Sequence, residues 1–267
     1  MARWYWVPCW DYCIAKAWMP DTDGKNVVVK GIQSLRASVE GFTKDNYDMK
    51  RFLIPFVSAF FFLITQIGTA QTAVDLGLSV KWASCNVGAL SPSEYGSYFA
   101  WGEVTSGKNE YSFFTLKYCR VNRGVHFSKY VPSGKWEDWI GRGAPDNKTR
   151  LELEDDAARS NWGGTWRTPS DSEWEELCTK CTWTWTQQSG KNGYKVTSKT
   201  NGNSIFLPAA GSRSDTRHDF MGDQGYYWSS SLGTNAFSAR YMTFNSLNVH
   251  RDQVHRCGGY SIRPVCD

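Results

Sequence analysis

Residues 226–266, YYWSSSLGTNAFSARYMTFNSLNVHRDQVHRCGGYSIRPVC, are the stretch around which the chain is organised. Apolar-patterned runs lie at its two ends, one around Tyr227 and Trp228 and the other between Tyr260 and Val265. Short runs rich in aromatic and β-branched residues are typical of core strands. A long segment of Asn, Ser, Arg, His, Asp and Tyr separates them. We therefore predict a rigid frame that presents a polar and aromatic surface for binding.

Strand signals also precede this stretch. Thr and Trp alternate over residues 182–186, as in a half-buried strand. Asn201-Gly202 is a hairpin turn signal between two further runs. Residues 103–147 and 245–259 are predicted to be long irregular connections. Strands are predicted at residues 182–186, 193–198, 204–207, 226–231, 236–244 and 261–265.

Two helices are predicted, over residues 151–162 and 171–180. The second begins at Ser170 in the sequence SDSE, whose S-x-x-E spacing forms a capping box. Trp174 and Leu177 lie three residues apart and would share its inward face.

An acidic cluster, Glu154, Asp155 and Asp156, lies in the first predicted helix. It has two interpretations, a calcium site or charges that favour a helix N-terminus. Calcium loops need spaced carboxylates and a glycine turn, which this cluster lacks. We expect the helix interpretation and no metal site.

Several blocks together resemble one known family. They are AVDLGLSVKWASCNVGA, YGSYFAWGE, LELEDDAA, NWGGTWRTPSDSEWEEL, NGNSIFLPAAG, YYWSSS and YSIRPV. In order and spacing they resemble the Fibrobacter succinogenes-type major paralogous domain of exported bacterial proteins, and the resemblance covers about residues 73–266. That family is related to formylglycine-generating-enzyme-like domains and to the variable proteins of diversity-generating retroelements. The resemblance implies an α+β, C-type lectin-like fold: two helices packed on a twisted antiparallel β-sheet, with long loops and adjacent N- and C-terminal strands.

The resemblance also implies a place for ligands. In the retroelement variable proteins the segment before the closing strand carries the binding residues, and here that segment is residues 245–256. Composition favours the same region, because Tyr, Ser and Asn are common in binding loops. Plain β-sheet surface is the alternative, since Tyr and Thr favour strands in any case. The candidate ligand-binding residues are Tyr226, Arg240, Asn245, Asn248, His250, Arg251, Asp252 and His255.

The chain departs from the enzymes and lectins of this fold. No E-P-N or Q-P-D motif with a later W-N-D is present, which argues against calcium-dependent sugar binding. A formylglycine-generating-type enzyme needs a reactive cysteine pair, whereas Cys257 and Cys266 fit a terminal staple better. The triplet Ser229 to Ser231 lacks a G-x-S-x-G elbow. None of the four histidines lies in a catalytic motif. We expect no enzyme activity and no cofactor.

An export signal is predicted inside the chain. Residues 49–51 are a basic start, residues 52–67 are apolar and uncharged, and small residues follow, as in a secretory signal peptide. A retained membrane anchor is the alternative, although the run is shorter than a span needs. We expect translation to begin at Met49, which makes residues 1–48 a mis-assigned or disordered leader. Residues 71–267 would then be the mature domain, secreted or on the cell surface, or else periplasmic.

Six cysteines follow the signal segment, and in an exported chain an even number favours disulfides. Six cysteines allow roughly 15 complete pairings. The pair in C-x-x-C could also serve redox or metal chemistry, but it lies near a predicted helix C-terminus, where the dipole does not lower a thiol pKa. The disulfide candidates are Cys85, Cys119, Cys178, Cys181, Cys257 and Cys266.

Charge and composition restrict the classes of binding partner that the sequence predicts. The net charge of +4 is small for 267 residues, which argues against a nucleic-acid partner because such domains usually carry a concentrated basic face. Two function classes remain beside the disfavoured enzyme. The first is an exported binding module for an unknown protein or glycan, and the second is a structural surface or fimbrial-type component. We favour the binding module.

Overall fold

The computed structural model describes residues 71–133 and 145–267. All of them belong to the second of the two units into which the chain divides, residues 66–267. The predicted leader and signal segment, residues 1–48 and 49–70, lie outside the described residues. Within the described ranges, no helix is long and apolar enough to cross a membrane.

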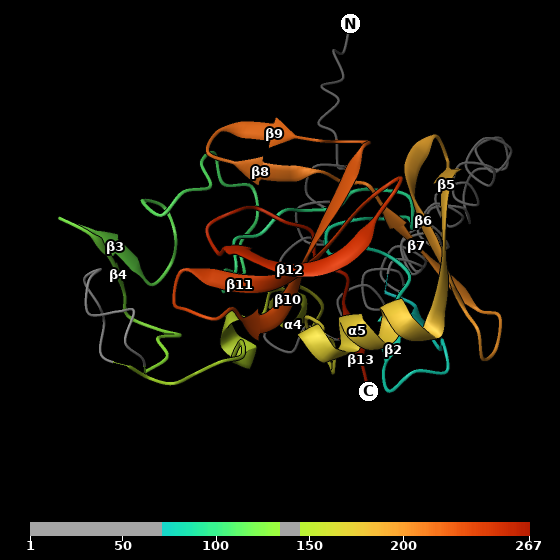
Figure 1. The fold of residues 1–267 in the computed structure, drawn as a ribbon, viewed down its shortest axis with the longest axis horizontal. Helices are drawn as coiled ribbons and strands as arrows, with labels where there is room; N and C mark the ends of the chain where they lie inside the picture. The colour runs from blue at the N-terminus through green and yellow to red at the C-terminus, as the bar shows by residue number, and fades with distance from the viewer. Residues whose placement is uncertain (1–70, 134–144) are drawn as a thin grey trace, which may run out of the picture. The chain divides into compact units, whose positions relative to one another are not determined.

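Antiparallel strands are the predominant regular structure of the described residues, and they form five small sheets (Figure 1). Three sheets have three strands each, and two are two-stranded hairpins. The sheets are β1 (Ala73–Val74), β2 (Lys81–Ala83) and β13 (Val265–Cys266); β3 (Cys119–Val121) and β4 (Val125–Phe127); β5 (Cys181–Gln188), β6 (Lys191–Ser198) and β7 (Ser204–Pro208); β8 (Ser212–Ser214) and β9 (Arg217–Asp219); and β10 (Gln224–Leu232), β11 (Ser238–Asn245) and β12 (Val249–His255).

The helices are short. They are the 3-10 helix η3 (Leu153–Asp155), α4 (Ala157–Trp162) and α5 (Asp171–Lys180). The capping box of α5 is formed as predicted, with the Ser170 hydroxyl and the Glu173 carboxylate each accepting the other residue's backbone N–H. Trp174 and Leu177 are fully buried in the largest core cluster, beside Tyr227 of β10.

The predicted C-type lectin-like α+β fold is wrong. Strands hold 39% of the described residues and helices only 10%, and the strands are divided among several small sheets rather than gathered in one. One physical reason lies in the predicted helix over residues 151–162. Asp156 has an extended backbone and caps α4 by accepting from Ala158 N and Arg159 N, so the helix starts anew there. The segment before it forms only the single turn of η3.

Two of the strand predictions are confirmed. The hairpin around Asn201-Gly202 is formed by β6 and β7, and the Thr/Trp alternation lies within β5. Residues 245–259 are not an irregular connection, because β12 occupies their centre and pairs with β11. Residues 103–147 contain the β3–β4 hairpin.

A buried arginine joins the ends of the domain. The Arg263 side chain is fully buried and donates to Asn86 Oδ1 at 2.9 Å and to three backbone carbonyls, of Ala83, Ser84 and Phe206, at 3.0, 2.6 and 2.7 Å. Burial, which opposes charge, lowers its pKa. These bonds fix the chain beside β13 to the segment after β2 and to β7. They explain why β13 lies next to β2 although the two are far apart in the sequence.

Candidate functional site

The register of the β10–β11–β12 sheet sorts its side chains onto two faces. Residues directly opposite one another in an antiparallel pair point to the same face, and alternate residues along a strand share it. One face therefore carries two rows of opposed residues: Tyr226–Thr243–His250 and Trp228–Tyr241–Asp252.

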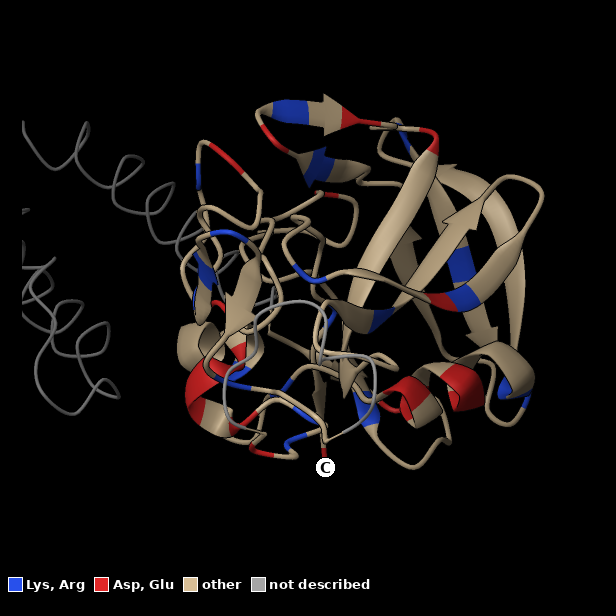
Figure 2. Ribbon diagram, turned by 60° about the vertical axis from the view of Figure 1, so that its left-hand side comes forward, with Lys and Arg blue, Asp and Glu red and all other residues tan. Residues whose placement is uncertain are grey.

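The opposite face of this sheet belongs to the core. Tyr227, Met242 and Phe244 are buried there in one cluster with Trp174 of α5. Arg251 extends this face to the rim of the helix. Its guanidinium binds Asp171 Oδ2 at 2.7 Å and Glu175 Oε1 at 2.9 Å, so it joins β12 to α5. In Figure 2 the acidic positions along α5 are red.

The structure places the eight predicted ligand residues on both faces of the sheet and in the β11–β12 turn. Tyr226, His250 and Asp252 lie on the face away from α5, and both His250 and Asp252 are exposed. Arg240 and His255 share the face of Arg251, and the His255 ring lies 5.3 Å from that of Phe113.

The two predicted asparagines serve the β11–β12 turn. Asn245 Oδ1 accepts the backbone N–H of Leu247 at 2.9 Å and that of Asn248 at 3.0 Å. The Asn248 carbonyl accepts Asn245 N at 3.0 Å. These contacts shape the turn, and the predicted surface therefore does not form one continuous patch.

Aromatic rings gather around Tyr226 on the face away from α5. The ring centroids of Tyr226 and Tyr260 are 5.2 Å apart, those of Tyr241 and Tyr260 are 5.5 Å apart, and the planes of Tyr226 and Tyr241 differ by only 9°. The Phe220 ring, 54% exposed, lies 6.4 Å from that of Tyr226 and forms the outer rim. We call this set, with the two carboxylates described next, the tyrosine face: Asp219, Phe220, Tyr226, Tyr241, Asp252 and Tyr260.

Two carboxylates act on these rings. Burial raises the pKa of Tyr226, and the negative charge of Asp219 raises it further. Burial likewise raises the pKa of Tyr241 to about 12, with contributions from Asp252 and Tyr226. The Asp252 side chain accepts one backbone N–H, from Gln253 at 2.8 Å, and forms no ion pair with any described residue.

Phe220 has a strained backbone. Its φ is +58°, in the left-handed region that a bulky residue rarely adopts. The Phe220 carbonyl accepts the backbone N–H groups of Asp223 at 3.1 Å and Gln224 at 3.0 Å, which holds the turn into β10. Strained residues that persist in a structure are enriched at binding sites. Here the strain accompanies an exposed aromatic ring beside Tyr226.

Of the tyrosine face, the sequence predicted only Tyr226 and Asp252 as ligand residues. Tyr260 was predicted only as part of a core strand, and no ligand residue was predicted in the segment of Asp219 and Phe220. The pattern Asp-Phe-Met-Gly-Asp from Asp219 was an available signal, because it places two large apolar side chains in a turn. Both are exposed, Phe220 at 54% and Met221 at 46%.

A second aromatic and acidic group lies around η3. Asp155 is fully buried and accepts from Lys117 Nζ at 2.7 Å, Lys129 Nζ at 2.5 Å, the Tyr118 hydroxyl at 2.8 Å and the Tyr130 hydroxyl at 2.7 Å. Burial opposes its charge, yet these four bonds hold the pKa of Asp155 at about 2. We call these five residues the closed cluster.

Two acidic residues beside the closed cluster, Glu152 and Glu154, also contact Lys129 of that cluster. Glu152, Glu154 and Asp155 bring carboxylate oxygens within 4.8 Å of one another, an arrangement that could hold a metal ion. Lys129 Nζ contacts all three, at 2.6, 3.1 and 2.5 Å. An ammonium group thus supplies the positive charge. The helix interpretation of this cluster holds for Asp156 alone, which caps α4.

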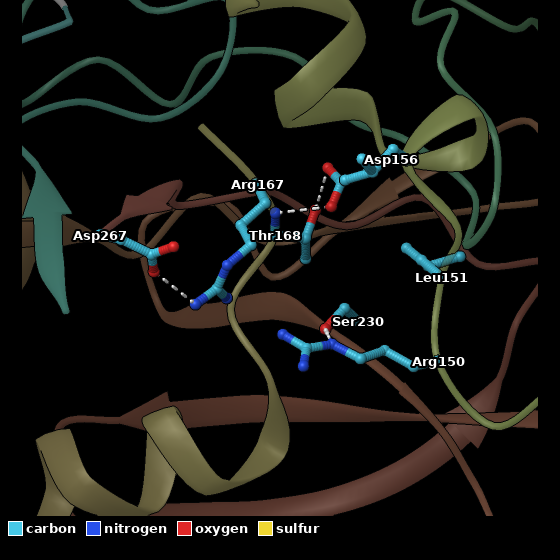
Figure 3. A pocket seen from close by; sticks show the side chains of 8 residues that line it. Arg150, Leu151, Asp156, Arg167, Thr168, Ser230 and Asp267 are labelled. Carbon is cyan, nitrogen blue, oxygen red and sulfur yellow. Dashed lines mark hydrogen bonds and ion pairs between the residues drawn. The ribbon is translucent and has the colours of Figure 1, made fainter. Parts of the chain in front are cut away.

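A polar cavity of about 340 Å³ lies between η3 and the segment before α5 (Figure 3). Arg167 donates to both carboxylate oxygens of Glu173, at 2.8 and 2.6 Å, and Asp156 accepts from the Thr168 N–H and hydroxyl, each at 2.8 Å. Most of the charged groups that line the cavity are therefore paired within the chain. The cavity thus lies where chain segments meet through polar contacts. Its lining residues are Arg150, Leu151, Leu153, Asp156, Arg167, Thr168, Ser230 and Asp267.

The six cysteines are free thiols in the structure, so the expected disulfides are not formed there. Burial raises the pKa of Cys178 to about 12 and that of Cys257 to about 11. Raised thiol pKa values oppose formation of the reactive thiolate. Cys178 and Cys181 therefore lack the electrostatic surroundings of a redox C-x-x-C pair.

Comparison with known proteins gives no further guide. No family model matches the chain, and no curated protein or solved structure is similar to it.

Proposed function

We propose that the domain is an exported binding module and that the tyrosine face is its contact surface. The observation that carries this proposal is the exposed Phe220 ring, held in a strained backbone beside Tyr226, on a face where the Asp252 carboxylate has no ion-pair partner among the described residues. Aromatic residues supply large rigid contact area at low entropic cost, and exposed apolar groups near polar ones are typical of binding surfaces.

Strain and exposure both support this choice. A buried aromatic cluster would explain Tyr260, which is 7% exposed, by packing alone. Packing does not explain Phe220 and Met221, whose side chains remain about half exposed in a turn held by hydrogen bonds. Export rests on the predicted signal segment, which lies outside the described residues. The ligand is a protein or a glycan.

The test is ligand capture on arrays of glycans and of surface proteins with the whole chain and a Tyr226→Leu/Tyr241→Leu variant. Leucine keeps apolar bulk and removes both rings. We expect a captured ligand to be lost by about tenfold or more, as for central aromatic contacts. Phe114→Leu is the matched control, because Phe114 is 78% exposed and lies outside the tyrosine face. Capture that survives in the double variant with unchanged affinity would contradict the proposal.

A further inference from the structure

Three tyrosine sites elsewhere in the described structure share one composition, a tyrosine ring, a nearby carboxylate and a lysine of the same chain. In the closed cluster, Lys129 Nζ lies 5.3 Å from the Tyr118 ring centroid and 5.2 Å from that of Tyr130 and binds Asp155. An ammonium group over a ring is attracted by the negative face of the π-system. The carboxylate balances its charge.

The other two sites also combine a lysine over a tyrosine ring with a carboxylate whose charge acts on that ring, and in the first of them the lysine also binds the carboxylate. Lys108 Nζ lies 5.9 Å from the Tyr111 centroid and 2.9 Å from Glu103, whose charge also acts on Tyr111. Lys191 Nζ lies 4.8 Å from the centroid of Tyr95, whose pKa is raised by burial and by Asp223. In each case the chain provides its own cation.

The tyrosine face has the rings and the carboxylates, but no described lysine or arginine lies over its rings. Among residues 71–133 and 145–267, the cation–ring contacts fall on other aromatic residues. Arg251 lies on the opposite face of the sheet and binds α5. Arg217 of the β8–β9 hairpin lies 4.0 Å from Asp219, so this carboxylate of the tyrosine face already has a cation of the same chain beside it. Asp252 beside Tyr241 has no ion-pair partner in the part of the chain that the structure describes.

Charge complementarity therefore selects the ligand. Ring faces and carboxylates both repel anions, which disfavours a phosphate or sulfate group. A neutral sugar could stack on the rings but would leave the charge of Asp252 unbalanced. A cation contacts the rings and the carboxylates at once, as Lys129 and Lys108 do in two of the lysine-filled sites.

We propose that the tyrosine face binds a lysine or arginine side chain presented by a partner protein. This inference rests on the proposed function and names its ligand chemistry. The cation lies over Tyr226 and Tyr241, with Asp252 as its principal counter-charge and Asp219 as the second. The apolar stem of such a side chain packs against Phe220, because lysine and arginine carry long methylene chains.

The test measures binding of the full chain to a blocked octapeptide that alternates lysine with glycine. Versions with arginine, norleucine or glutamate in place of lysine provide the comparison. We expect the lysine and arginine peptides to bind, the norleucine peptide to bind at least about tenfold more weakly, and the glutamate peptide not to bind. Raising the ionic strength from about 0.01 to about 0.15 M should weaken the interaction.

Three variants locate the contact. Asp252→Asn and Tyr241→Leu should each weaken lysine-peptide binding by about fivefold to tenfold, whereas Tyr241→Phe, which keeps the ring, should stay within about twofold of the parent. Asp223→Asn is the charge-matched control, because Asp223 acts on Tyr95, a site with its own lysine. It should bind as the parent does. Urea unfolding of each variant separates lost binding from lost folding.

The outcomes distinguish this inference from the proposed function. Equal binding of the lysine and norleucine peptides, no binding of any peptide, or insensitivity to Asp252→Asn would overturn the cation inference. If a glycan is captured instead and Tyr226→Leu/Tyr241→Leu abolishes that capture, the binding surface stands and its ligand is a sugar. If the double variant leaves every captured ligand unaffected, the proposed function itself fails.

Discussion

The tyrosine face and the closed cluster are built from the same residue types but are completed differently. Both place tyrosine rings within about 6 Å of one another beside carboxylates. In the closed cluster Asp155 is fully buried and is satisfied by two lysines and two tyrosine hydroxyls. On the tyrosine face Asp252 is exposed, and its side chain accepts one hydrogen bond from a described residue, the N–H of Gln253.

The difference in burial and pairing of the two carboxylates distinguishes a cluster that stabilises the fold from a surface that can bind a partner. A buried charge must be paired inside the fold, since leaving it unpaired costs more than most single contacts contribute. An exposed carboxylate is solvated and need not be paired. The same rings and carboxylates can therefore hold one region of a domain together and remain available to a partner in another.

The largest effect is expected for Asp155→Asn. The substitution keeps the shape of the side chain but removes the charge that two lysines share, so it should lower the free energy of unfolding by about 3 kcal/mol, as for one partner of a buried pair. Urea unfolding measures it. Glu154→Gln is the control, because Glu154 contacts the same Lys129 but is 65% exposed, and it should cost no more than about 0.5 kcal/mol. A loss below about 1 kcal/mol for Asp155→Asn would show that the cluster is not structural.

The comparison of the parent protein with Asp155→Asn also predicts the pH range over which the charge of Asp155 stabilises the fold. The pKa of Asp155 is about 2 in the folded chain, below the value of about 3.9 for an ordinary aspartate. A lowered pKa means that its contribution is complete above the ordinary value and is lost as pH falls toward the folded one. The stability difference between the parent and Asp155→Asn should thus be constant above about pH 5 and shrink between about pH 4 and 2. A difference that does not change over this window would contradict the assignment.

Local signals in the sequence predicted the elements that local physics determines. The α5 capping box and the β6–β7 turn at Asn201-Gly202 depend on residues within a few positions of one another. The strand β12 escaped prediction because its inward Arg251 looks like a surface residue in the sequence. Its partners, Asp171 and Glu175, are some 80 residues away in the chain, so only the tertiary structure shows why an arginine can face α5.

The candidate site was only partly predictable for the same reason. Tyr226 and Asp252 lie in the stretch that was expected to bind, and the strand register places them on one face. Asp219 ends β9, Phe220 comes from the turn between β9 and β10, and Tyr260 comes from the segment after β12. Their convergence depends on the packing of three separate segments, which neither composition nor periodicity reports.

A lysine can be built into the tyrosine face to make it resemble the closed cluster. Asp252 lies directly opposite Tyr241, so Asp252→Lys places an ammonium group next to that ring. We expect lysine-peptide binding to fall by more than about tenfold, since the variant loses the counter-charge and gains a competing cation. Stability should change by less than about 0.5 kcal/mol, because the site is exposed. Isothermal titration and urea unfolding measure the two.

Asp223→Lys provides the matched control for this change. It reverses the same charge at an exposed position whose electrostatic effect falls on Tyr95. Binding should weaken by no more than about twofold, the amount expected from net charge at physiological salt. If both variants weaken binding equally, the tyrosine face attracts cations only through the overall charge of the protein.

The smallest effects are expected at Phe220, where two substitutions separate the strain of the backbone from the contact that the ring makes with the peptide. Phe220→Gly and Phe220→Ala both remove the rim ring, but only glycine adopts a φ of +58° without steric cost. The glycine variant should therefore be more stable than the alanine variant by about 1 kcal/mol, measured by urea unfolding. Both should weaken lysine-peptide binding by the same factor of about three, because that loss comes from the ring. Wild-type affinity in both variants would remove Phe220 from the tyrosine face. Equal stability of the two would mean that the turn relaxes on loss of the ring, and that Phe220 itself imposes the strained backbone.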